Sequence, residues 1–325
     1  MMNQELLKST VEASLVGFAI GDALGVPVEF CHRDELRRNP VQGMRAFGVH
    51  YQPIGTWSDD SALTFQLVEN LVEGYDPHKL ARRFLAWYQL GEWSAHGYVF
   101  DIGIATRTAL HRLEQGISPS LSGEREEYSN GNGALMRILP LAFSLLAEKS
   151  RMVRWQTVRE VASLTHAHIR STMGSFAFVE MVRHLLLGHD KQQAYQLTRQ
   201  ETADFLVALP APASELELFQ RVLFQDIGQL PEEEIYSSGY VIHTLEACLW
   251  CFLTTDTFKD ATLKAVNLGN DTDTVAALTG ALAGITYGYD SIPSAWLHAL
   301  VRIDDIQDLA GRFSNWLQAR PTLPK

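Results

Sequence analysis

The chain has 325 residues, of which 46% are hydrophobic and 20% charged, so it can bury a large core without disulfides. Its formal net charge of −11 disfavours a surface for nucleic acid or anionic lipid, because both depend on clustered Lys and Arg. A phosphate group on any ligand must therefore be held locally, by backbone amides or by a metal ion.

The cysteines and the first residues indicate a compartment. Cys31, Cys248 and Cys251 are too few and too unevenly spread for a disulfide framework, which favours a reducing environment. Residues 1–14 lack a basic segment followed by an apolar run, and we identify no stretch with the roughly 18 apolar residues of a membrane span. We expect a soluble, cytoplasmic protein with neither a membrane nor nucleic acid as a partner.

Apolar residues recur at helical spacing along almost the whole chain, first in residues 15–23, then in 63–71 and 80–87. No segment alternates for long like a half-buried strand. Glycines follow several of the apolar runs, where a left-handed residue often ends a helix: Gly25, Gly74, Gly91 and Gly188. The pattern predicts an all-α protein.

Two stretches interrupt this periodicity, residues 115–133 and residues 209–238, and the second is rich in Pro, Glu and Ser. Either could be a linker between domains. The candidate site residues described below come from both sides of each stretch, so we predict a single domain over residues 1–325.

The first acidic cluster lies at residues 55–61, just before a periodic helix. Ser58 is a plausible N-cap, and Asp59 and Asp60 fall in the first turn. Acidic residues there stabilise the helix dipole by about 0.3–1 kcal/mol each. For this segment alone, that structural explanation is the better one.

A second acidic cluster, with Asp271 and Asp273, precedes a helix whose residues 275–284 are mostly small. Small residues allow close helix approach, so this cluster could lie deep in the protein. Four buried carboxylates would repel one another and have raised pKa values unless cations neutralised them. Oxygen ligands favour Mg²⁺ or Mn²⁺ over zinc. Two clusters suggest a two-metal site, although spacing does not establish that they meet.

The order of seven short motifs resembles the ADP-ribosylglycohydrolase family over about residues 14–288. The motifs are Gly21 to Gly25 with Glu29, Gly55 to Ser61, Asp101 to Gly103, Ser129 to Gly133 with Met136 and Arg137, Thr165 with His166, Ser238 to Tyr240, and Asp271 to Thr274. Each motif is weak alone, but their ordered combination is highly specific. The resemblance implies a compact orthogonal helix bundle around a binuclear site for two divalent cations, Mg²⁺ or Mn²⁺.

The resemblance also implies which residues form the metal site and carry the chemistry. The implied metal ligands are Ser58, Asp59, Asp60, Asp271, Asp273 and Thr274. The implied catalytic carboxylates, one of which would move a proton, are Glu29, Asp60 and Asp101. Asp22 is expected to support the metal site without binding the cations.

A glycine-containing loop is the expected diphosphate site, and its residues are Ser129, Asn130, Gly131, Asn132 and Gly133. Its glycines would expose backbone amides to the phosphates. By composition alone a flexible turn is the better interpretation, since Gly and Asn are ordinary turn residues. The family position favours binding instead.

Two ring side chains complete the expected substrate contacts. The resemblance implies that His166 lies near the phosphates, whereas His168 is expected to be structural at a helix end. Tyr240 stands where arginine-directed bacterial relatives place an adenine-stacking aromatic residue. The alternative for Tyr240 is a core tyrosine packed below Val241 and Leu245.

The resemblance implies a hydrolase that removes ADP-ribose from modified proteins, so its partners would be ADP-ribose and an ADP-ribosylated protein. N-linked ADP-ribosylarginine is the favoured substrate, because the loop and Tyr240 look like the bacterial dinitrogenase-reductase-activating type. The alternatives are an O-linked ADP-ribosylserine hydrolase, a toxin-immunity protein and a catalytically silent member. The presence of all four aspartates disfavours the silent member, and the 20 residues before Gly21 leave little for an extension that plugs a toxin.

Overall fold

The structure is a computed structural model that describes residues 4–210 and 212–320. Its α-helices are α1 (Gln4–Gly25), α2 (Arg33–Arg38), α3 (Asp59–Val72), α4 (Pro77–Leu90), α5 (Ile104–Glu114), α6 (Pro119–Ser122), α7 (Leu139–Ser144), α8 (Arg151–Ser163), α9 (Ile169–Leu186), α10 (Lys191–Val207), α11 (Ala213–Leu218), α12 (Val241–Leu253), α13 (Phe258–Val266), α14 (Thr272–Tyr287), α15 (Ser294–Ala299) and α16 (Ile303–Ala319). Short turns add η1 (Val26–Val28), η2 (Gly48–His50), η3 (Gln220–Phe224), η4 (Ile227–Gln229), η5 (Glu232–Glu234) and η6 (Tyr289–Ser291). Between residues 4 and 320, leaving out 211, we find isolated β-bridges but no strand, which confirms the all-α prediction.

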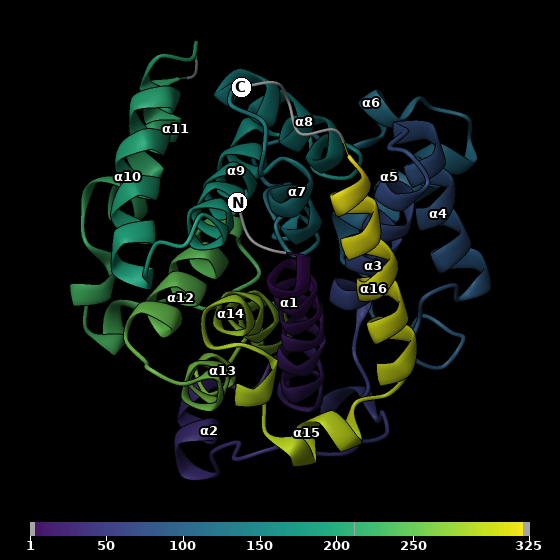
Figure 1. Ribbon diagram of the computed structural model, residues 1–325, viewed down its shortest axis with the longest axis vertical. Helices are drawn as coiled ribbons and strands as arrows, with labels where there is room; N and C mark the ends of the chain where they lie inside the picture. The colour runs from purple at the N-terminus through teal and green to yellow at the C-terminus, as the bar shows by residue number, and fades with distance from the viewer. Residues whose placement is uncertain (1–3, 211, 321–325) are drawn as a thin grey trace.

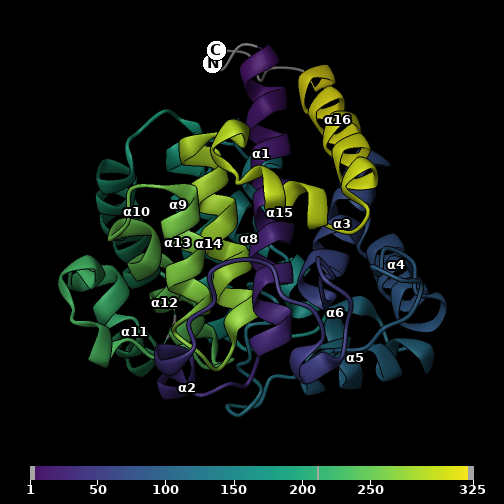
Figure 2. The same ribbon diagram turned by 90° about the horizontal axis from the view of Figure 1, so that it is seen from below.

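Helices α1 and α14 lie side by side at the centre of the molecule (Figures 1 and 2). Small residues allow this approach, because a Cβ added at Gly21 would overlap the carbonyl of Ala276, and one added at Gly280 would overlap the carbonyl of Gly17. At the end of α1, Gly25 leaves room for the backbone of Asp273. The close packing therefore brings the end of α1 against the start of α14.

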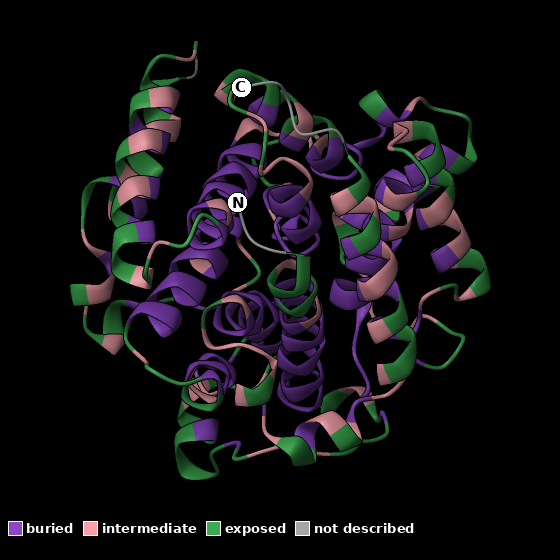
Figure 3. Ribbon diagram, in the orientation of Figure 1, coloured by how far each residue is buried: buried purple, intermediate pink, exposed green. Residues whose placement is uncertain are grey.

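The other helices cover this central pair. Helices α12 and α13 pack against α14, while α3 and α16 pack near α1, and α9 touches both α12 and α14. Figure 3 shows that α14, α1 after its first turns and much of α9 and α12 are buried, whereas α16 and α4 carry exposed outer faces. The apolar periodicity thus corresponds to helices wrapped around a buried pair.

The ends of several helices agree with the sequence. Gly74, Gly91 and Gly188 have positive φ values of 89°, 69° and 91°, as expected for residues that end helices. For Gly25 the expectation of a left-handed residue is wrong, because its φ is −81° and the chain continues directly into η1. His168 caps α9, since its Nδ1 accepts a hydrogen bond from the backbone N–H of Arg170 at 3.2 Å, which confirms its structural role.

The second predicted irregular stretch is only partly irregular. Residues 209–238 contain α11, the π-helical turn η3 and the short turns η4 and η5. Residues 115–133 contain only the four-residue helix α6. The Pro, Glu and Ser content of the second stretch concealed α11, because charge and proline reduced its apolar periodicity.

The N-terminal helix is long and apolar enough to cross a membrane, by length and composition only. The stretch Gln4–Val28 has a mean hydropathy of 1.5, so our expectation that no such stretch exists is wrong. Inside the fold, however, 94% of the 18-residue apolar window within this stretch is buried. Its apolarity follows from its position as a central core helix.

Candidate active site

The two acidic clusters meet at the starts of α3 and α14. Ser58 is the N-cap of α3, where its Oγ accepts a hydrogen bond from the backbone N–H of Asp60 at 3.3 Å. The Ser58 Oγ also donates to the Asp60 carboxylate at 3.2 Å, and the Thr274 Oγ1 donates to the same oxygen at 3.4 Å. Residues 214 positions apart in the chain are thus in direct contact.

All four aspartates of the clusters have raised pKa values. Burial is the main cause of the raised pKa in each case, and repulsion by neighbouring carboxylates adds to it. The four residues are Asp59, Asp60, Asp271 and Asp273. Among the described residues, one buried carboxylate oxygen of Asp60 and one of Asp271 have no hydrogen-bond partner. Unsatisfied oxygens in an acidic, oxygen-only set fit a hard divalent cation such as Mg²⁺ or Mn²⁺.

A buried carboxylate from α1 holds the start of α3. Asp22 accepts hydrogen bonds from the backbone N–H of Ser58 at 2.9 Å and from the backbone N–H and Oγ of Ser61 at 3.1 and 2.6 Å. Burial raises the pKa of Asp22 to about 6, although these donors oppose the shift. Asp22 therefore positions the first acidic cluster.

A further set of titratable side chains, Glu29, His50 and Asp101, lies beside the two acidic clusters. Glu29 follows η1 and Asp101 precedes α5, and ligand-type atoms of Glu29, His50 and Asp101 all lie within 4.8 Å of one another. The His50 Nε2 hydrogen-bonds to the Glu29 carboxylate. Burial raises the pKa of Glu29 to about 7, and the hydrogen bond that His50 makes to Glu29 raises the pKa of His50. Sequence reasoning missed His50, which belongs to no motif.

The predicted diphosphate loop is tied to the second acidic cluster. The Asn132 side-chain amide donates to the Asp271 carboxylate and to the Thr244 Oγ1, both at 2.9 Å. Its backbone N–H donates to the Gly239 carbonyl at 2.9 Å, and the backbone N–H of Val241 donates to the Asn130 carbonyl at 3.0 Å. These bonds place the loop beside Asp271 and the start of α12.

Two side chains of this loop, those of Ser129 and Asn130, make hydrogen bonds within the protein. The Ser129 Oγ donates to Glu124 at 2.9 Å. The Asn130 amide donates to the Glu127 carbonyl at 2.8 Å, and its oxygen accepts from the Ser171 Oγ at 3.2 Å. The side chains of Ser129 and Asn130 are therefore not free to bind a ligand, and the Ser129 backbone N–H also donates within the protein, to the Glu126 carbonyl at 3.0 Å.

His166 lies against the glycines of the loop. A Cβ added at Gly133 would be 2.7 Å from the His166 Cε1, and one added at Gly131 would be 3.5 Å from its Nε2. His166 is 3% exposed, and burial, together with the charge of Arg137, lowers its pKa to about 3. The ring is therefore neutral near pH 7.

Arg137 joins the loop to the histidine. It is fully buried, and its guanidinium donates to the Gly133 carbonyl and to the Thr165 Oγ1, the latter at 2.7 Å. The same Thr165 hydroxyl hydrogen-bonds to the His166 Nδ1 at 2.8 Å. This chain of contacts fixes the orientation of His166 relative to the loop.

Tyr240 is half-buried at the N-cap of α12. The Arg170 guanidinium lies 5.8 Å from its ring centroid, and the His243 ring packs against it edge-on at 5.0 Å. The ring is partly exposed and also packs against the buried core, so its role stays a prediction. The structure thus brings most of the predicted site residues into one contact network, while their roles stay predictions.

Comparisons with known proteins agree with this geometry. A family model for ADP-ribosylglycohydrolase matches residues 3–322. The chain is 37% identical to an ADP-ribosylarginine hydrolase Tri1 of Serratia proteamaculans, over 92% of this chain and 77% of that protein. It is 30% identical to an ADP-ribosyl-[dinitrogen reductase] glycohydrolase of Rhodospirillum rubrum, over 88% of each. A solved structure titled ADP-ribosylglycohydrolase-related protein complex is similar with a TM-score of 0.79 and 30% identity, over 96% of this chain and 99% of that chain.

Proposed function

The chain belongs to the ADP-ribosylglycohydrolase family, and on that premise we propose that it removes ADP-ribose from modified proteins, with N-linked ADP-ribosylarginine as the substrate. The observation that carries the proposal is the contact of Asp60 with Thr274 beside the glycine loop. The relatives named for arginine and dinitrogenase reductase favour the arginine linkage. We further propose that the protein acts in the cytoplasm.

Two divalent cations would be held by the hydroxyls and carboxylates at the starts of α3 and α14, namely Ser58, Asp59, Asp60, Asp271, Asp273 and Thr274. When bound, such cations orient ribose hydroxyls and make a water molecule more acidic. Asp22 keeps the first cluster in place through its bonds to the N-terminal turn of α3. Asn132 restrains Asp271 in the second cluster.

The loop and the rings beside it would hold the rest of the substrate. Within the described residues, the backbone N–H groups of Asn130, Gly131 and Gly133 make no hydrogen bond, so they could bind a diphosphate without a cation, which suits a chain of charge −11. The neutral His166 can offer its Nε2 for a hydrogen bond to a phosphate or ribose oxygen. Tyr240 would stack on the adenine through its free face, because Arg170 lies over one side of the ring.

The reaction breaks the bond between C1 of the ribose and a guanidine nitrogen of arginine. Water supplies the oxygen that bonds to C1, and one water proton ends on the departing guanidine. Positive charge develops on the ribose as the bond breaks, and the surrounding carboxylates stabilise it. Glu29, Asp60 and Asp101 would be the carboxylates that accept and return the proton. The hydrogen bond from His50 orients the Glu29 carboxylate.

The test is release of ADP-ribose from two peptides of one sequence, modified on arginine in one case and on serine in the other. We expect Mg²⁺- or Mn²⁺-dependent release from the arginine-linked peptide and loss of activity in chelator. Release from the serine-linked peptide alone would replace the proposed linkage with the O-linked alternative. Release that persists after exhaustive chelation would contradict the metal-dependent mechanism.

A further inference from the structure

An irregular segment separates the candidate active site from a neighbouring pocket. Residues 97–101, which we call the docking segment, connect α4 to α5 without regular structure. Within the described parts of the chain, no backbone N–H or C=O of these five residues makes a hydrogen bond. Tyr98 is 50% exposed, so part of the segment is accessible to a partner. The chain bends at Gly97, whose φ is 81°, and at Tyr98. Backbone groups without partners in the protein are the feature that peptide-binding proteins use to pair with an added strand.

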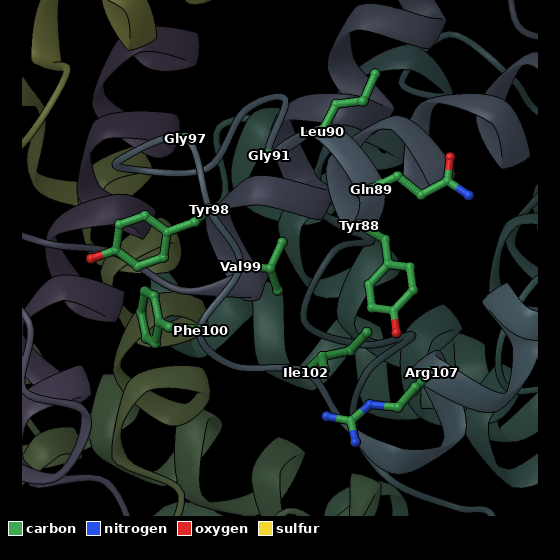
Figure 4. Close-up of a pocket in the computed structure, with 10 residues that line it drawn as sticks. All are labelled: Tyr88, Gln89, Leu90, Gly91, Gly97, Tyr98, Val99, Phe100, Ile102 and Arg107. Atoms are coloured by element: carbon green, nitrogen blue, oxygen red, sulfur yellow. The ribbon is translucent and has the colours of Figure 1, made fainter.

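The pocket beside the docking segment has a volume of about 510 Å³, and α4 residues including Tyr88 and Leu90 line its far side. Figure 4 shows Val99 on the side of the segment that faces Tyr88, while Tyr98 and Phe100 point the other way. Tyr98, Val99 and Phe100 also line a small cavity that contains Asp59 and Asp101. The docking segment is therefore a wall shared by the pocket and the candidate active site.

Arg107 supplies an unpaired positive charge to this pocket. It lies in the first turns of α5, is exposed and lines the pocket with Ile102. Among residues 4–210 and 212–320, its guanidinium makes no direct ion pair or hydrogen bond, although its charge helps to lower the pKa of Asp101, which burial raises. In a chain of net charge −11, a free arginine beside a pocket favours an acidic side chain on whatever binds there.

We infer that the docking segment, the pocket and Arg107 bind the stretch of the substrate protein that flanks the ADP-ribosylated residue, as an extended, acidic peptide. The inference rests on the proposed function. The peptide runs along residues 97–101 at the roughly 4.8 Å spacing of paired strands, and an Asp or Glu side chain reaches Arg107. The modified side chain then crosses the docking segment toward Asp101. Recognition of the flanking sequence is thus separate from recognition of ADP-ribose.

The test compares a small substrate with peptides. The substrates are free ADP-ribosylarginine and two ADP-ribosylarginine peptides of equal length, one flanked by Asp and one by Lys. We expect kcat/KM for the Asp peptide to exceed that for the Lys peptide about tenfold, mainly through KM. Arg107→Glu should reverse this preference, and because the charge of Arg107 also acts on Asp101, the readout is the ratio of kcat/KM for each peptide to that for free ADP-ribosylarginine. N-methylation of alternate peptide bonds in the Asp peptide should raise its KM, because each methyl removes a backbone donor.

The matched control is Arg159→Glu, which makes the same charge change at an exposed arginine on α8 and should leave all three substrates unchanged. Equal losses on free ADP-ribosylarginine and on the peptides in Arg107→Glu, or no peptide preference in the wild type, would overturn the inference. If the wild type does not cleave free ADP-ribosylarginine, the proposed function fails instead. Fluorescence polarisation with the unmodified Asp peptide then decides: weaker binding to Arg107→Glu supports the docking segment, and equal binding overturns it.

Discussion

Burial sets the charge state of single residues around the candidate site. His166 is a solvent-excluded imidazole whose pKa is lowered to about 3, whereas burial raises the pKa of Glu29 to about 7. The histidine is therefore neutral across the range in which most enzymes work, and it contributes hydrogen bonds rather than charge. Its neighbour Arg137 has its pKa lowered to about 9 by burial.

The role of Tyr240 can be tested by removing its ring. A stacked base is typically worth about 1–3 kcal/mol, so Tyr240→Ala should weaken ADP-ribose binding roughly tenfold or more. The affinity for Mg²⁺ should stay nearly the same, because Tyr240 is not among the predicted metal ligands. Calorimetric titrations with ADP-ribose and with Mg²⁺ measure both. An unchanged affinity for ADP-ribose would mean that Tyr240 only packs against Arg170 and His243.

A buried acid outside the site should make stability depend on pH. Burial raises the pKa of Glu246 from its usual 4.5 to about 7, and Arg221, 3.4 Å away, only partly opposes the shift. Because Glu246 has a higher pKa in the folded state than in the unfolded state, protonated Glu246 favours the folded protein. This contribution to the free energy of unfolding is complete below about pH 4.5 and is lost as the pH rises through 7. Between pH 5 and pH 8 the loss should be roughly 2–3 kcal/mol.

Glu246→Gln provides the comparison, since an amide does not ionise. Urea unfolding of both proteins at several pH values should give a steeper decline of the free energy of unfolding for the wild type than for Glu246→Gln. Parallel curves would show that Glu246 titrates normally and that its burial carries no such linkage.

Among the helices, the contact of α1 with α14 determines where the second acidic cluster lies. Gly17, Gly21 and Gly25 allow backbone approach along the interface, and Gly25 lies directly against the backbone of Asp273. The start of α14 is thus positioned by the absence of a side chain on α1. A side chain added at Gly25 should therefore lower the free energy of unfolding and weaken metal binding at the same time.

Gly25→Ala tests this link between packing and site. The new methyl group would overlap the Asp273 backbone, so overpacking should lower the free energy of unfolding by about 1–3 kcal/mol and reduce the Mg²⁺-dependent rise in Tm. Gly311→Ala on α16 is the control, because nothing lies within 4 Å of its added Cβ. It should be neutral or stabilising by about 0.5–1 kcal/mol. A Gly25→Ala protein with normal stability and a normal Mg²⁺ response would contradict the argument.

For the whole molecule, the buried carboxylates link folding to cation binding. Divalent ions should stabilise the protein by about 2.7 kcal/mol at a concentration one hundred times the dissociation constant. For a chain of this length the corresponding rise in Tm is only about 4 °C. Asp273→Asn removes one repelling charge, so the metal-free protein should be as stable as the wild type or slightly more so, with a smaller Mg²⁺-dependent shift and lower activity.

Melting of both proteins without metal and with saturating Mg²⁺ distinguishes a ligand from a helix-stabilising residue. If Asp273 served only the dipole of α14, its loss would destabilise the protein equally in both conditions. That outcome would remove Asp273 from the predicted ligand set. The same scans done with EDTA-treated protein give the metal-free reference.

The sequence alone determined the features of this protein that depend on interactions between residues close together in the chain. Helical periodicity predicted the all-α class, and hydrogen bonding of a short side chain to a nearby backbone amide predicted Ser58 as the N-cap of α3. The ordered motifs identified the family, which the comparisons confirm. The single domain and the roles of the site residues stay predictions.

Only the tertiary structure decided which distant groups meet. No periodicity or spacing links Asp60 to Thr274, Asn132 to Asp271 or His50 to Glu29, because each contact depends on how all the helices pack. The same holds for Gly25. Its place in the sequence suggested a residue that ends a helix, but in the structure it allows the backbone of Asp273 to come close to α1. Contacts between distant residues depend on the burial of the whole core, and that information is not contained in any local window of sequence.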